Sequence, residues 1–285
     1  MLDRLKYNHS MNKLTTAKRA QVIAALIEGN SVRSTARLTG VAFNTILKFL
    51  PEIGRACTAY QDRVFRNLKC QRIQCDEIWS FCYAKQANVP ERFEGKFGVG
   101  DIWTWVALCA DTKLVPAWRV GQRDAITAEK FMRDLAGRLA NRVQLTTDGN
   151  RTYLTAVERA FGSAIDYAML VKIYAANPEG GEVRYSPAQC CGATKEAIMG
   201  HPVRQDVSTS YVERQNLTMR MQIRRFTRLT NAFSKKVENH AAAVALHYMA
   251  YNFAKVHKSL RVTPAMEAGV ADHVWAMEEI AQLIS

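Results

Sequence analysis

The chain lacks the long apolar runs that membrane-spanning helices need. No uninterrupted apolar stretch of about eighteen residues occurs in it, and its N-terminus does not read as a secretory signal peptide. From these absences we expect a protein with no membrane association and a cytoplasmic location.

Cysteine is present but without the spacing that builds zinc modules. The seven cysteines are an odd number and contain no C-x-x-C pair, which argues against a disulfide framework and a compact zinc site. The adjacent Cys190 and Cys191, together with His201, are a weaker alternative metal site. Reduced thiols are the better interpretation.

Acidic residues are scarce in two parts of the chain, which has a formal net charge of +13. Residues 1–70 hold twelve Lys or Arg and four acids, and residues 214–261 hold ten Lys or Arg and one acid. The region between them is balanced, and the tail from residue 262 is acidic. Two basic segments around a neutral core predict a polyanionic partner.

Length and composition predict one sizeable core and a small extra domain, since 48% of the 285 residues are hydrophobic. The expected segments are a flexible N-terminus at 1–12, a helix-turn-helix domain and linker at 13–70, a catalytic domain at 71–261 with an insert at 177–206, and an acidic C-terminal helix at 262–285.

The first basic segment contains the start and stop signals of three short helices. Thr15 or Thr16 is placed to cap a helix that ends near Gly29, and Ser31 opens a second helix that stops at Gly40. A third helix follows and is expected to break at Pro51, with a further helix or linker beyond it. This order predicts a helix-turn-helix, a small all-α unit.

In a helix-turn-helix the third helix lies in the DNA major groove. Asn44, Thr45 and Lys48 would then face bases or phosphates, while Arg33 and Arg37 would approach the backbone. The alternative is a plain three-helix bundle without a ligand.

From Arg72 onward the pattern changes to strands and then alternates with helices. The expected order is strands at 72–84, 102–111 and 113–123, a helix at 124–141, a strand at 142–149, a helix at 150–162, a strand at 165–175 and a helix at 211–225. This order is typical of the α/β class, specifically an RNase H-like mixed sheet with flanking helices on both faces. The polar insert between the last strand and the last helix reads as irregular.

The last helix carries one acid on an otherwise cationic surface. Ser208, Thr209 and Ser210 are the candidate N-caps. Glu213, Asn216 and Arg220 are spaced to share one face, and Arg224 and Arg225 follow at the far end. We expect this to be a phosphate-binding surface on which Asn216, Arg220, Arg224 and Arg225 contact DNA. The simpler alternative is a solvated helix on which Glu213 pairs with Arg220 or another neighbour.

Two further acids fall where strands can bring them together. Asp76 lies inside the first strand, and Asp148 ends the fourth strand beside a glycine. If those strands are neighbours, both carboxylates converge at one edge, and Glu213 completes the set from the helix above. Glu77 is the rival of Asp76, but alternation along a strand turns its side chain to the opposite face.

Three carboxylates in one place can hold two Mg²⁺ ions roughly 3.5 to 4 Å apart, one activating a nucleophile and one steadying a leaving oxygen. Oxygen ligands suit Mg²⁺, with Mn²⁺ as a substitute, whereas zinc would favour a thiol-rich set. Taken alone, Asp148 is also explained as a turn residue, and Asp101 and Asp111 read as ordinary turn acids.

Four sequence blocks together resemble a known family. These blocks are CDEIWSF, TTDGN, YVERQNLTMRMQIRR and FSKKVENH. They resemble the DDE transposases of bacterial insertion sequences, most closely the family named for the first insertion sequence described. The resemblance covers roughly residues 72–258. It lacks that family's N-terminal zinc segment, and the insert at 177–206 is longer than in the shortest relatives.

The resemblance implies that Asp76, Asp148 and Glu213 are the catalytic, metal-binding triad. It also implies that Arg220 contacts DNA near the scissile bond and that Asn216 supports the site. The expected activity is Mg²⁺-dependent strand cleavage and transfer at the ends of an element. A homodimer or larger assembly is expected, because two ends of double-stranded DNA must be held together.

Two other functions fit the same residues. A structure-selective nuclease of the same fold would cut DNA without regard to end sequence. A helix-turn-helix regulator that has lost catalysis would bind DNA and show no metal-dependent activity.

Overall fold

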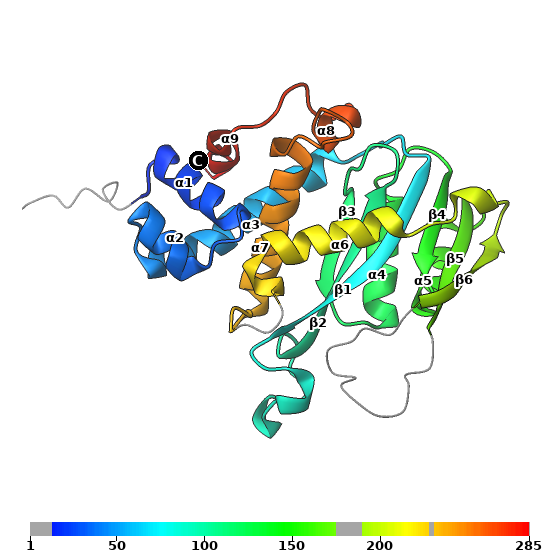
Figure 1. The fold of residues 1–285 in the computed structure, drawn as a ribbon, viewed down its shortest axis with the longest axis horizontal. Coiled ribbons are helices and arrows are strands. Elements are labelled where there is room, and N and C mark those ends of the chain that lie inside the picture. The colour runs from blue at the N-terminus through cyan, green and yellow to red at the C-terminus, as the bar shows by residue number, and fades with distance from the viewer. Residues whose placement is uncertain (1–12, 175–189, 228–230, 285) are drawn as a thin grey trace, which may run out of the picture.

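The protein is a layered α/β structure with a helical end, which the helices between residues 16 and 64 form (Figure 1). The computed structural model describes residues 13–174, 190–227 and 231–284. The predicted flexible N-terminus at 1–12 and residues 177–189 of the predicted insert therefore lie outside the described residues. No helix in the described part of the chain combines the length and the apolar character needed to cross a membrane.

A six-stranded mixed sheet forms the centre of the molecule, in the order β3-β2-β1-β4-β5-β6. Its strands are β1 (Arg72–Cys82), β2 (Gly100–Cys109), β3 (Ala117–Gly121), β4 (Val143–Asp148), β5 (Ile165–Tyr174) and β6 (Cys190–Met199). β1 runs antiparallel to β2 and parallel to β4, and β4 runs parallel to β5. The predicted mixed sheet is confirmed, and its order is compatible with an RNase H-like fold.

The sixth strand corrects the prediction of an irregular insert. β6 pairs antiparallel with β5 along most of its length. Most of its residues are exposed, and its sequence, CCGATKEAIM, has little of the β-branched and aromatic character that marks a strand. An edge strand stabilised mainly by backbone pairing leaves a weak signal in the sequence.

Helices cover both faces of the sheet, as predicted. The helices are α1 (Thr16–Ile27), α2 (Val32–Thr39), α3 (Phe43–Val64), α4 (Ala125–Ala136), α5 (Thr152–Phe161), α6 (Ser210–Gln222), α7 (Val237–Met249), α8 (Pro264–Glu267) and α9 (Met277–Gln282). On one face Trp105 packs against Phe131 of α4 and Tyr153 of α5. On the other face, Val106 shares a core cluster with buried residues of α6 and α7.

The first two helices begin and end where the sequence predicts, and the third does not. Thr15 caps α1 and Ser31 caps α2, which ends at Gly40 in a left-handed conformation. α3 runs through Pro51 as one helix of 22 residues. The predicted break at Pro51 is therefore wrong, because buried residues on both sides of the proline pack into one core and outweigh its missing hydrogen bond.

The helical end is packed directly onto the rest of the protein. α3 crosses α7 so closely that a Cβ atom on Gly54 would lie 2.5 Å from the Cβ of Ala242. Buried residues of α1 and α3 belong to the same core cluster as those of the sheet. The tail predicted as one acidic helix instead forms the two short helices α8 and α9, and α9 packs on α1.

Candidate metal and nucleic-acid site

Asp76 and Asp148 lie on neighbouring strands, as the sequence predicts. β1 and β4 pair in parallel up to Cys75 and Thr147, so the next residue on each strand is an aspartate. Among the described residues, one carboxylate oxygen each of Asp76, Glu77 and Asp148 lies within 4.8 Å of the others. This is a distance at which a shared cation can bind.

Glu77 belongs to this cluster, and the expectation that strand alternation excludes it is wrong. Glu77 pairs with Trp105 of β2, and its side chain leaves the strand on the face opposite Asp76. However, β4 ends at Asp148, and the chain then turns so that Asn150 Nδ2 donates to Glu77 Oε1 at 3.1 Å. An Asp-Glu pair where a strand extends past its neighbour is the signal that could have revealed it.

Arg123 bridges two carboxylates of the cluster. Its Nε donates to Glu77 Oε2 at 3.1 Å, and an Nη atom lies 3.6 Å from Asp148 Oδ2. Asn150 N also donates to Asp148 Oδ1 at 3.1 Å. Arg123 and Asn150 were not predicted as site residues, because both lie in loops that only the fold brings to this cluster.

Burial and mutual repulsion raise the pKa values of the cluster. Burial, followed by the charge of Asp148, raises the pKa of Asp76 to about 6. The same two causes raise the pKa of Glu77 to about 7. The pKa of Asp148 is also raised, chiefly by burial. Ionising all three carboxyls is therefore costly unless a cation compensates the charge.

Glu213 lies beside this cluster on α6. Its charge raises the pKa of both Asp76 and Asp148. Its Oε1 accepts a hydrogen bond from Thr209 and forms an ion pair with Lys172 Nζ of β5 at 2.6 Å. The structure thus groups Asp76 and Asp148 with Glu77, and Glu213 is not a member of that group among the described residues. Its charge reaches both aspartates, while its carboxylate is paired with Lys172, a residue that was not predicted from the sequence.

The N-terminus of α6 is bonded to the strand that carries Asp76. Gln74 Oε1, buried on β1, accepts hydrogen bonds from the backbone N–H groups of Tyr211 at 2.9 Å and Val212 at 3.2 Å. Thr209 occupies the N-cap position but makes no capping bond there. Of the three predicted caps, Ser208 accepts a hydrogen bond from Ser210 N at 3.2 Å, and Gln74 supplies the next two bonds from the sheet, which sets Glu213 relative to Asp76.

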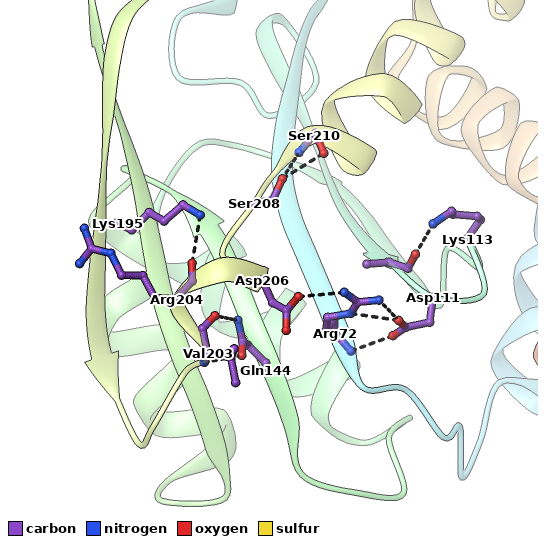
Figure 2. A network of polar contacts seen from close by, with 11 residues as sticks. Arg72, Asp111, Lys113, Gln144, Lys195, Val203, Arg204, Asp206, Ser208 and Ser210 are labelled. Carbon is purple, nitrogen blue, oxygen red and sulfur yellow. Dashed lines mark hydrogen bonds and ion pairs between the residues drawn. The ribbon is translucent and has the colours of Figure 1, made fainter.

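The segment between β6 and α6, residues 200–209, is hydrogen-bonded to the first residues of β1 and β4 (Figure 2). Arg72 donates to Asp206 at 3.0 Å and also binds Asp111, which confirms a structural role for that turn acid. Gln144 and Val203 exchange two hydrogen bonds, of 3.1 and 2.8 Å. These contacts hold the linker flat against the sheet and so fix where α6 begins.

Asn216 and Arg220 lie on the same helix as Glu213. Asn216 Nδ2 donates to Asp76 Oδ2 at 2.9 Å, so Asn216 holds one oxygen of the buried carboxylate. Arg220 is half-buried one turn further along α6. The predicted pairing of Asn216 with the site is consistent with this contact.

The two arginines after α6 have different surroundings. Arg224 is exposed, whereas Arg225 is half-buried and its Nη1 donates to Ser234 Oγ at 3.1 Å. Ser234 then donates to His240 Nδ1 at 2.9 Å, and His240 Nε2 donates to Ser80 Oγ at 3.1 Å, because the Ser80 hydroxyl is itself a donor to a backbone carbonyl. Arg225, predicted to bind DNA, therefore anchors an internal hydrogen-bond chain.

The predicted DNA-contacting residues of the helical end lie on its surface. Arg33 and Arg37 of α2 and Asn44 and Lys48 of α3 are exposed, and Thr45 is half-buried. This accessibility is what a contact with DNA requires.

The donor set of the carboxylate cluster fits a hard divalent cation. All of its ligand atoms are oxygens, which suits Mg²⁺ or Mn²⁺ rather than zinc. The raised carboxyl pKa values come first from burial and second from the charge of Asp148, and a bound divalent cation would offset both. The predicted alternative of Cys190, Cys191 and His201 is not among the metal-ligand groups of the described residues.

Comparisons with known proteins return little. No known protein family matches this chain, and no curated protein matches it. Among solved structures, the chain is similar to a piggyBac transposase in a synaptic complex with hairpin DNA. The TM-score is 0.41 at 11% sequence identity, over 98% of this chain and 73% of that chain. This similarity is too low to carry an inference about function.

Proposed function

We propose that this protein is a transposase of the DDE class, which binds the ends of an insertion sequence and cleaves and joins DNA strands with a divalent metal. The observation that supports this most is the meeting of Asp76 and Asp148 on adjacent parallel strands, with Glu213 on a helix bonded to the same β1. The basic segments on either side of the core supply the charge that a DNA substrate needs.

In this proposal Asp76, Asp148 and Glu213 would hold Mg²⁺, with Glu77 close enough to act as a further ligand. The metal would supply activation of a water or 3′-hydroxyl nucleophile and stabilise charge on the leaving oxygen. Asn216 orients the carboxylate of Asp76 through its hydrogen bond. Arg123 and Lys172 form ion pairs with Glu77 and Glu213, and in this proposal they would also bind phosphate oxygens of the DNA.

The proposed domain layout follows the charge distribution. Residues 13–70 would recognise DNA through α2 and α3, residues 71–261 would carry out the chemistry, and residues 262–285 would form a tail packed on the helical end. Because two DNA ends must be joined, the working form would be a homodimer or a larger assembly on double-stranded DNA.

The test is metal-dependent nicking of labelled DNA taken from either side of the coding region, comparing the wild type with Asp148→Asn. We expect cuts at one defined position with Mg²⁺ or Mn²⁺ and none with the variant. Asp101→Asn, which removes an acid outside the cluster, is the matched control and should still cut.

Other outcomes separate the alternatives. Cuts spread along the DNA without regard to end sequence would replace the transposase with a structure-selective nuclease. Tight binding without any metal-dependent cut would replace it with a DNA-binding regulator.

A further inference from the structure

Four half-buried aromatic side chains form a continuous row next to the carboxylate cluster. This aromatic row consists of Trp79 and Phe81 of β1, Trp103 of β2 and Phe233. The ring centroids of Trp79 and Phe81 are 5.8 Å apart, and those of Phe81 and Phe233 are 4.8 Å apart. Trp79 and Trp103 are direct partners across the β1–β2 pair, so their side chains stand side by side.

The row shares its sheet face with Glu77. Side chains two residues apart on a strand point to the same face, so Glu77, Trp79 and Phe81 follow one another at spacings of roughly 7 Å. Glu77 and Trp105 are buried under α4 and α5, whereas Trp79 and Phe81 further along β1 are partly open to solvent. The row therefore leads outward from the carboxylates.

Cations lie at both ends of the aromatic row. The guanidinium of Arg123 lies 4.8 Å from the ring centroid of Trp103, and the same group bonds to Glu77. At the far end, Lys235 Nζ lies 4.1 Å from the ring centroid of Phe233. A row of rings with a cation at each end is suited to the bases and phosphates of a nucleic-acid strand.

We propose that the aromatic row binds unpaired bases of single-stranded DNA adjacent to the phosphodiester that is cut. This inference rests on the proposed function, because the carboxylate cluster defines where the cut falls. In a duplex both faces of an interior base are already stacked on neighbouring bases, so ring stacking on the protein selects nucleotides that are frayed, flipped out or single-stranded. The substrate is thus a DNA end with unpaired bases.

The experiment measures binding of the full-length protein in EDTA, so that no cleavage is needed. Fluorescence anisotropy compares a blunt duplex, the same duplex with a thymidine overhang, and a single strand of thymidines. Trp79→Leu keeps apolar bulk and removes the ring. We expect it to weaken overhang and single-strand binding about tenfold, and blunt-duplex binding less than twofold.

Phe97→Leu is the matched control, because Phe97 is 59% exposed and lies outside the row. It should bind every probe like the wild type. Should Trp79→Leu fail to fold, as judged by circular dichroism, the wild type alone decides the question. A 2-aminopurine base in the overhang is expected to lose fluorescence on binding, as stacking on a ring requires.

Several results would overturn the inference. These are equal wild-type affinity for blunt and overhang DNA, an unquenched 2-aminopurine, equal losses for Trp79→Leu and Phe97→Leu, tighter binding of an RNA strand than of DNA, or a variant that only loses self-association. Ring-dependent strand binding without any cleavage would retain the inference and count against the proposed chemistry. Cleavage at the same rate with and without unpaired bases would support the proposed chemistry and overturn the inference about the aromatic row.

Discussion

Gln74 of β1 caps the helix that carries Glu213, through a 3.2 Å hydrogen bond from Val212 N to its side-chain oxygen. Gln74 lies two residues before Asp76, and Val212 lies one residue before Glu213. A single contact between strand and helix therefore connects two of the proposed metal ligands, and it is buried from water.

Replacing Gln74 with alanine should test this connection. The variant leaves two N–H groups at the start of α6 without their partner, so we expect the free energy of unfolding to fall by about 1 to 2 kcal/mol. Metal-dependent cleavage should fall by more than the loss of folded protein explains. Gln74→Glu keeps an acceptor and should restore most of both, so a variant pair with equal defects would refute the capping role.

The carboxylate cluster predicts opposite effects of pH with and without metal. Asp76 and Glu77, with pKa values of about 6 and about 7, hold protons more tightly in the folded protein than in the unfolded chain. Without metal, their contribution to stability is present at low pH and is lost as pH rises from about 4 to about 7.

Saturating Mg²⁺ should therefore raise the melting temperature near pH 7.5, by roughly 5 °C, and should have little effect near pH 5, where the carboxyls are protonated. Thermal denaturation at the two pH values checks this. Asp148→Asn should abolish the rise. A rise of equal size at both pH values would place the cation elsewhere.

Arg224 and Arg225 are adjacent in sequence and should behave differently. Arg225→Ala removes the donor at the start of the buried hydrogen-bond chain, so we expect a loss of about 1 to 3 kcal/mol in the free energy of unfolding. Arg224→Ala, at an exposed position, should leave stability unchanged and weaken DNA binding. Urea denaturation and a binding assay measure both, and matching profiles for the two variants would contradict the assignment.

His240 should make the protein sensitive to acid. Burial, followed by the charge of Arg225, lowers its pKa to about 3, below the ordinary value of 6.5. Its contribution to stability is therefore present above about pH 6.5 and is lost as the pH falls toward 3. The stability gap between the wild type and His240→Leu should narrow over that range in urea titrations, whereas exposed His201→Gln should run parallel to the wild type.

Asn44 and Lys48 should contribute to DNA recognition in different ways. On the proposed recognition helix, Asn44→Ala should reduce the preference for the cognate end over random duplex by about tenfold, because it removes hydrogen bonds to a base. Lys48→Ala should weaken both DNAs together and lower the salt dependence of binding. A preference ratio that both variants leave unchanged would remove α3 from the recognition surface.

Part of the site could be predicted because it follows from local pattern. A carboxylate inside an apolar strand and another at a strand end gave Asp76 and Asp148, and the parallel pairing of β1 with β4 brought them together. Glu77 was missed because alternation predicts only the sheet face from which a side chain leaves the strand. It does not predict that the side chain can reach residues that follow a shorter neighbouring strand. Lys172 and Arg123 were missed because their proximity depends on contacts between distant segments.

The fold shows the same division. The caps of α1 and α2 are local and were predicted, whereas the cap of α6 comes from Gln74, which is 137 residues away in sequence from Tyr211. Pro51 predicted a break that tertiary packing overrides. The edge strand β6 was missed because its stabilisation comes from pairing with β5 and not from its own side chains.

The uninterrupted helix α3 fixes the distance between its two ends. From Asn44 to Gly54 a helix spans about 15 Å, and at Gly54 the helix has no room to slide, because it lies against Ala242. The exposed residues at the start of α3 therefore keep a constant position relative to α7, on which the helix is packed. If α3 reads DNA and the carboxylate cluster cuts it, as proposed, the number of base pairs between the sequence that is read and the bond that is cut should be the same in every DNA substrate.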